Sequence, residues 1–111
     1  IEVDVGTGAG SFPVAADMDF AGLFTTIGQL SNSINWTGNI DEVAIFNTDQ
    51  SANISSIYNG GTPNDLTSLN PLAWYRMGDN DTFPTITDNG SGGNNGTMTN
   101  MGAGDIVSDK P

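Results

Sequence analysis

The sequence contains no cysteine and no histidine, and its only basic residues are Arg76 and Lys110. Without cysteine it forms no disulfide, so sulfur chemistry gives no indication of its compartment. Without histidine it holds neither a Ser-His-Asp triad nor a histidine-rich zinc site. No apolar run approaches the length of a membrane-spanning helix, so the sequence predicts no such helix.

Thirteen acidic residues against these two bases give a net charge of −11. A phosphate backbone and an anionic membrane would both be repelled, so we expect no nucleic acid and no membrane among its partners. The acids are scattered along the chain, which is typical of a soluble acidic surface in a salty or extracellular setting. The alternative is that some of these carboxylates bind Ca²⁺, which prefers oxygen ligands.

The pattern of residues predicts many short strands. The 111 residues suffice for one small domain, and their polarity comes from Asn, Thr, Ser and Gly, which favour turns over helices. The strongest predicted strand covers residues 36–47. Further strands are expected at residues 1–5, 12–16, 22–30, 72–77 and 96–101, with polar loops at 78–84 and 88–95. We therefore expect an all-β fold, a β-sandwich or jelly roll with one short helix.

The short helix is predicted directly after the strongest strand. Thr48 or Asp49 can cap its start by accepting hydrogen bonds from free backbone N–H groups. Gly60 or Gly61 can end it in the left-handed conformation. Three apolar residues at helical spacing form one stripe, and a helix this short depends on packing of that stripe. The stripe consists of Ile54, Ile57 and Tyr58.

Residues 38–47 with 54–61 read as a strand followed by a short helix, and residues 72–79 with 88–97 as a strand followed by a Gly/Asn-rich loop. The first set resembles the last strand and following helix of laminin-G-like domains, of the concanavalin A-like lectin/glucanase superfamily, and the second resembles the opening strand and first loop of such a domain. The resemblance implies a concanavalin A-like sandwich, whole or in large part. It also implies the kind of repeat found in surface or fibre proteins of marine phages and bacteria.

In this chain, the residues that resemble the end of a laminin-G-like domain come before those that resemble its beginning. We therefore assign residues 1–61 to the C-terminal part of a sandwich, 62–71 to a connector, and 72–111 to the opening of a following or rearranged repeat. Either the chain is a slice across two tandem repeats, or the sandwich is rearranged. Since the family's first and last strands are neighbours, the Trp74 strand is expected to pair with the Ile40 strand. Either this pair closes a small sheet without the missing middle, or the missing strands come from elsewhere. An unpaired sheet edge invites strand addition from another chain, so we predict that the chain works as part of an assembly.

Glu2 and Asp4 are the strongest indication of an enzyme. Laminarinase-type relatives carry Glu-x-Asp-x-x-Glu on one strand, but the final position here is Thr7. Glycoside hydrolysis needs two carboxyl groups, so we interpret these residues as a solvated edge strand and predict no catalytic residue.

Asp79, Asp81 and Asp88 are the candidate metal ligands. They lie in polar loops that could supply oxygens to Ca²⁺, the one cofactor that the sequence suggests. The spacing does not fit an EF-hand, because Phe83 stands where a third ligand would be. The alternative is that these residues form turns, which we favour.

Asp41 and Glu42 lie next to each other in the strongest predicted strand. Alternation sends one of them inward, where a carboxylate needs a partner. Arg76 is the only arginine and follows the strand expected to lie alongside. We therefore predict a structural ion pair between Arg76 and either Asp41 or Glu42.

Three aromatic residues could stack on a sugar ring. Trp74 and Tyr75 are adjacent, so they point to opposite faces, and Trp74 is the better core residue. Trp36 at a strand start and Tyr75 are then the candidate ligand-binding residues.

The sequence favours a non-catalytic structural or adhesive module on an extracellular or virion surface, with protein neighbours or further copies as partners, and glycans in addition. The alternative is a Ca²⁺-dependent, lectin-like carbohydrate-binding module.

Overall fold

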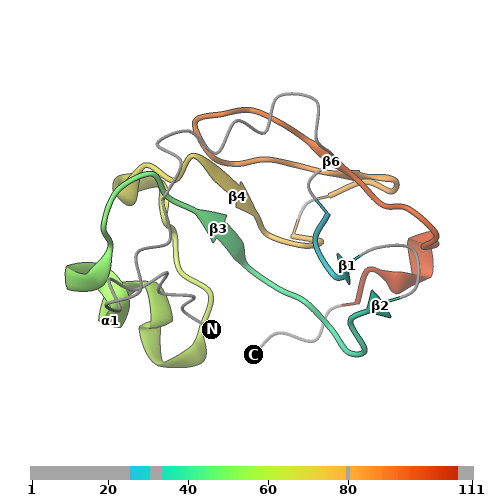
Figure 1. The fold of residues 1–111 in the computed structure, drawn as a ribbon, viewed down its shortest axis with the longest axis horizontal. Coiled ribbons are helices and arrows are strands. Elements are labelled where there is room, and N and C mark those ends of the chain that lie inside the picture. Colours follow the sequence, from blue (N-terminus) through green and yellow to red (C-terminus); the bar gives the residue numbers. More distant parts are fainter. Residues whose placement is uncertain (1–25, 31–33, 80, 108–111) are drawn as a thin grey trace, which may run out of the picture. The chain divides into compact units, whose positions relative to one another are not determined.

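The computed structural model describes residues 26–30, 34–79 and 81–107, and the chain divides into two units, residues 1–36 and 37–111. In the first unit, strands β1 (Gln29–Leu30) and β2 (Ile34–Asn35) form an antiparallel pair in which Gln29 lies opposite Asn35 (Figure 1). The strands predicted at residues 1–5 and 12–16, with Glu2 and Asp4, lie outside the described residues.

The second unit is built on two strands that are distant in the sequence. Strand β3 (Val43–Ile45) pairs antiparallel with β4 (Ala73–Tyr75), and Ala44 lies opposite Trp74 (Figure 1). This is the pairing expected for the Ile40 and Trp74 strands, although both strands are shorter than predicted. The first one is short because Glu42, just before it, has a left-handed backbone with φ 51°, which interrupts the extended conformation.

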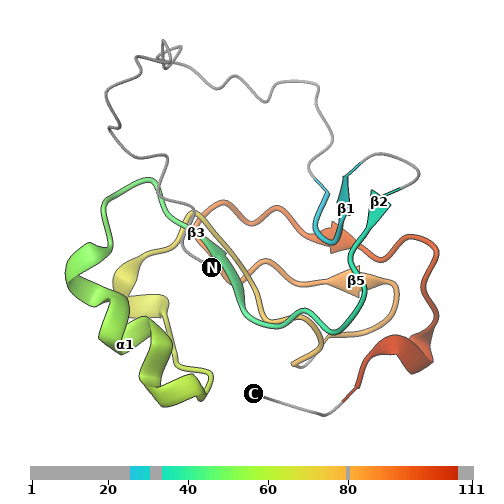
Figure 2. The same cartoon turned by 60° about the horizontal axis from the view of Figure 1, so that its bottom comes forward.

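A second pair lies further along the chain. Strands β5 (Thr85–Ile86) and β6 (Gly96–Thr97) run antiparallel, with Ile86 opposite Gly96 (Figure 2). Strand β6 falls within the predicted strand 96–101. Strand β5 lies between the two predicted loops, where no strand was expected, because its two residues carry too little pattern to be recognised without a partner.

The helical segment is a series of short turns. The 3-10 helix η1 (Ser51–Asn53) leads into α1 (Ile54–Tyr58) and then η2 (Asn59–Gly61). Asp49 Oδ1 accepts a hydrogen bond from the backbone N–H of Ser51 at 2.8 Å, which satisfies one donor at the start of this segment. The left-handed conformation begins one residue earlier than predicted, at Asn59 with φ 44°. Two further 3-10 turns follow, η3 (Thr67–Leu69) and η4 (Ala103–Asp105).

The apolar stripe of α1 packs only in part. Ile57 is half-buried, whereas Ile54 and Tyr58 are 44% and 67% exposed. In the residues that the structure describes, the apolar core consists of Leu66 and Trp74, each 4% exposed. The described residues thus form short antiparallel strands with one short helix, in agreement with the predicted all-β class.

Candidate functional site

The site is centred on Trp74, whose indole is held by Glu42. Glu42 Oε2 accepts a hydrogen bond from Trp74 Nε1 at 2.7 Å, and its Oε1 accepts one from Arg76 Nε at 2.9 Å. The left-handed backbone of Glu42 is unusual for a residue with a side chain and needs surrounding contacts to persist. The two hydrogen bonds supply such contacts, so this strained residue ties the start of β3 to β4.

Arg76 joins two carboxylates. Besides the ion pair with Glu42, its Nη2 lies 2.9 Å from Asp79 Oδ2, and its guanidinium carbon lies 5.3 Å from the centre of the Trp74 ring. The hydrogen bond to Glu42 raises the pKa of Arg76 against the opposing effect of burial, with help from the charges of Glu42, Asp79 and Asp41. Of the two partners left open by the sequence, Glu42 forms the ion pair.

The backbone of Trp74 is held by a second carboxylate, Asp88, which is 8% exposed. Asp88 Oδ1 accepts hydrogen bonds from the N–H groups of Trp74 at 2.9 Å and Gly90 at 2.8 Å. Its Oδ2 accepts one from Asn94 N–H at 2.8 Å. Burial alone would raise the pKa of Asp88, but the three backbone N–H groups outweigh it and lower the pKa. This side chain therefore fastens the loop 88–95 to β4.

The backbone of the same loop lies close against β4 and the residues before it. Asn89 N–H donates to Trp74 O at 2.7 Å, and Gly92 N–H donates to Leu72 O at 2.8 Å. A Cβ at Gly90 would lie 2.7 Å from Ala73 Cα, and one at Gly92 would lie 2.8 Å from Leu72 O. Residues 88–95 form a loop, as predicted, but its close contact with β4 was not predicted. The glycines that punctuate it were the available signal, since glycine permits close backbone approach.

The three candidate metal ligands are bonded to different groups of the chain. Asp79 binds Arg76, and Asp88 binds the backbone groups given above. Asp81 accepts hydrogen bonds from the N–H groups of Gly78 at 3.0 Å and Thr87 at 2.8 Å. Within residues 26–30, 34–79 and 81–107, no three acidic, histidine or cysteine side chains gather as a metal site would require. Asp81 and Asp88 accept hydrogen bonds from backbone N–H groups, and Asp79 pairs with Arg76. Ca²⁺ binding at these residues stays a prediction.

The two candidate ligand-binding aromatics lie in different units. Trp36, in the first unit, is 60% exposed. Tyr75, in the second, is half-buried, and its hydroxyl donates a hydrogen bond to Asn94 O at 2.8 Å. Burial, with the nearby charge of Asp88, raises the pKa of Tyr75. Trp36 is therefore largely exposed, whereas Tyr75 contributes to holding the loop.

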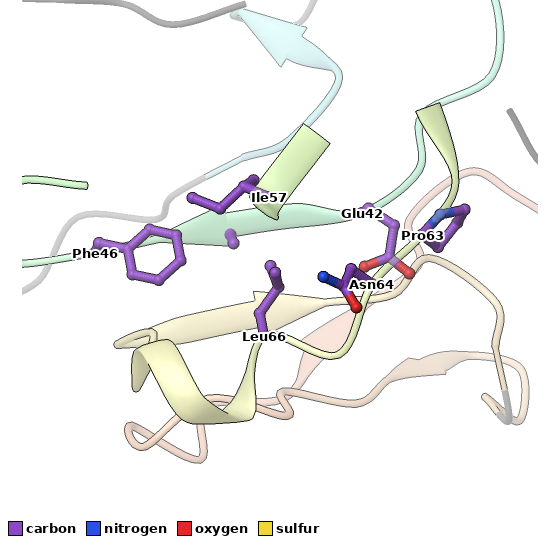
Figure 3. A pocket seen from close by; sticks show the side chains of 7 residues that line it. Glu42, Phe46, Ile57, Pro63, Asn64 and Leu66 are labelled. Carbon is purple, nitrogen blue, oxygen red and sulfur yellow. The ribbon is translucent and has the colours of Figure 1, made fainter. Parts of the chain in front are cut away.

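A small hollow lies beside Glu42. Its volume is about 170 Å³, and Figure 3 shows the side chains around it. The lining residues are Glu42, Ala44, Phe46, Ile57, Pro63, Asn64 and Leu66. The sequence analysis missed this hollow, because three separate segments of the chain form it. The spacing of Ala44 and Phe46, two positions apart, was the local signal.

Comparison with protein-family models, with curated proteins and with solved structures gave no match. The resemblance to laminin-G-like domains therefore stays a prediction, and function has to be argued from the contacts above. In the part of the chain that the structure describes, no helix is long and apolar enough to span a membrane.

Proposed function

We propose that this chain is a non-catalytic structural or adhesive module, concanavalin A-like in kind, of an extracellular or virion surface assembly. The observation that carries the proposal is the use of the acidic side chains around Trp74. Glu42, Asp79 and Asp88 are each bonded to other groups of the same chain. Carboxylates that bond to other groups of the same chain stabilise the fold. A structural or adhesive module requires a stable fold.

The surface of the β3–β4 pair supports a role in protein contacts. Ile45 and Leu72 are 44% and 45% exposed, and Leu72 N–H donates to Ile45 O at 2.8 Å, so the two residues are neighbours. Exposed apolar side chains on this strand pair favour association with another protein surface. The pairing of β3 with β4 also supports the family resemblance, in which the first and last strands are neighbours. Copies or adjoining repeats would then supply the remaining strands of the sandwich.

Sedimentation velocity over a range of protein concentrations tests this proposal. We expect the chain to associate with itself, and we expect Leu72→Lys to weaken that association. Ser68→Lys is the matched control, since it adds the same charge at an exposed position of η3. A folded chain that stays monomeric at every concentration would contradict the proposal.

Ca²⁺-dependent carbohydrate binding is the second candidate, favoured by the exposed ring of Trp36. A glycan array probed with and without Ca²⁺ separates the two functions. The structural module should give no Ca²⁺-dependent signal. A signal that requires Ca²⁺ and disappears in Trp36→Ala would instead support the lectin-like function.

A further inference from the structure

The hollow beside Glu42 has apolar walls. Ala44 and Phe46 line it from β3 and the residue after it, while Ile57 of α1 and Leu66 line it from other segments (Figure 3). Ala44 has only a methyl group between the larger Glu42 and Phe46, which leaves space over the strand. The hollow is open to solvent, and its volume of about 170 Å³ leaves room for a ligand body of about six or seven non-hydrogen atoms.

Glu42 keeps capacity for a hydrogen-bond donor of a ligand. Each of its oxygens accepts one hydrogen bond, from Trp74 Nε1 and Arg76 Nε. A carboxylate offers about four acceptor sites, so both oxygens can accept a further donor. Asn64 also lines the hollow, and its Nδ2 donates to Ser56 O while its Oδ1 accepts from Asp65 N–H, both at 2.9 Å. The hollow can therefore accept a ligand with a hydrogen-bond donor at the Glu42 end.

The charge around the hollow favours a positive donor. Arg76 is bonded to both Glu42 and Asp79, and Asp41 also acts on it electrostatically. Three carboxylates around one guanidinium leave the neighbourhood negative, and the whole chain carries −11. A field of this sign attracts cations and repels anions.

We propose that the hollow binds a small organic cation, an ammonium group on an apolar body. The ammonium donates to Glu42, and the body packs against Phe46, Ile57 and Leu66. Charge and shape are then recognised by different parts of the hollow. This site goes beyond the proposed structural function and does not depend on it.

Benzylammonium is the probe, titrated into the full chain with methyl and amide resonances followed by NMR. We expect saturable shifts at the methyl groups of Ile57 and Leu66 and at the indole N–H of Trp74. The dissociation constant should be on the order of 1 mM, as for other ligands of this size. Benzyl alcohol, which has the same shape without the charge, should bind about tenfold more weakly, because a charge-assisted hydrogen bond is lost. Benzoate should produce no shifts.

Two variants locate the site. Ala44→Leu fills the hollow and should abolish binding, whereas Ile45→Leu alters the next residue of β3, which does not line the hollow, and should leave binding unchanged. Glu42→Gln should weaken benzylammonium about tenfold and leave benzyl alcohol unchanged, which also checks that the hollow persists. Equal affinity of wild type for benzylammonium and benzyl alcohol would overturn the proposal. So would the lack of saturable shifts, or undiminished binding by a folded Ala44→Leu variant.

Discussion

Trp74 is held by two carboxylates in two different ways. On one side Glu42, with its longer side chain, reaches the indole N–H and the guanidinium of Arg76. On the other side Asp88, with its shorter side chain, accepts only backbone N–H groups, from Trp74, Gly90 and Asn94. The bond from Trp74 N–H to Asp88 is buried and has no substitute if the acceptor is lost, whereas the half-exposed side chains of Glu42 and Arg76 can turn toward water. The comparison predicts that stability depends more on Asp88 than on the Glu42 side.

The largest effect is expected for Asp88→Ala. The variant leaves one buried and two part-buried backbone N–H groups without their acceptor, which should lower the free energy of unfolding by about 2 kcal/mol. Urea denaturation measures the loss. Asp88→Asn, which keeps one acceptor oxygen, should lose less. A loss for Asp88→Ala smaller than that of Arg76→Ala would reverse the comparison.

Gly90→Ala tests the close contact between the loop and β4. The new Cβ would lie 2.7 Å from Ala73 Cα and 2.8 Å from Leu72 O, so backbone must move, at a cost of about 2 kcal/mol. Gly93→Ala is the control, because its φ of 62° strains alanine but nothing lies within 4 Å. That strain alone should cost about 1 kcal/mol. Equal losses in the two variants would show that the contact is unimportant.

Arg76→Ala tests the Glu42 side. It removes the ion pairs to Glu42 and Asp79. Because the side chains of Arg76 and Glu42 are 26% and 17% exposed, the free energy of unfolding should fall by about 1 kcal/mol. A melting curve measures it. Arg76→Lys should restore little, since an ammonium lacks the fork that reaches both carboxylates. An unchanged melting temperature in Arg76→Ala would rule out a stabilising ion pair.

The smallest change in stability is expected when the pH is lowered. The pKa of Asp88 is lower in the folded chain than its ordinary value of 3.8, so folding favours the ionised form. Its contribution is therefore complete above pH 3.8 and is lost as the pH falls through the lowered pKa. Stability measured against pH should decline in that window, and the decline should be shallower in Asp88→Asn. Parallel curves for wild type and variant would count against this role of Asp88.

Several of these contacts could be predicted from the sequence. Trp74 was expected in the core because it alternates with Tyr75, and a carboxylate partner for Arg76 was expected because Arg76 is the only arginine. The choice between Asp41 and Glu42 was beyond reach, since alternation fails where Glu42 turns left-handed. Asp88 was interpreted as a candidate metal ligand, because an aspartate that binds an ion and one that binds backbone N–H groups have the same sequence surroundings.

Composition and local pattern were enough to exclude histidine and cysteine chemistry, to indicate an acidic surface and to predict short strands with one short helix. These properties depend on residue type or on near neighbours, so a single sequence contains them. Only the tertiary structure decided which carboxylate meets which side of Trp74, and that a hollow lies beside Glu42. Glu42 and Trp74 are 32 positions apart, and Trp74 and Asp88 are 14 apart. Contacts at such separations depend on strand register and loop path, which no local pattern specifies.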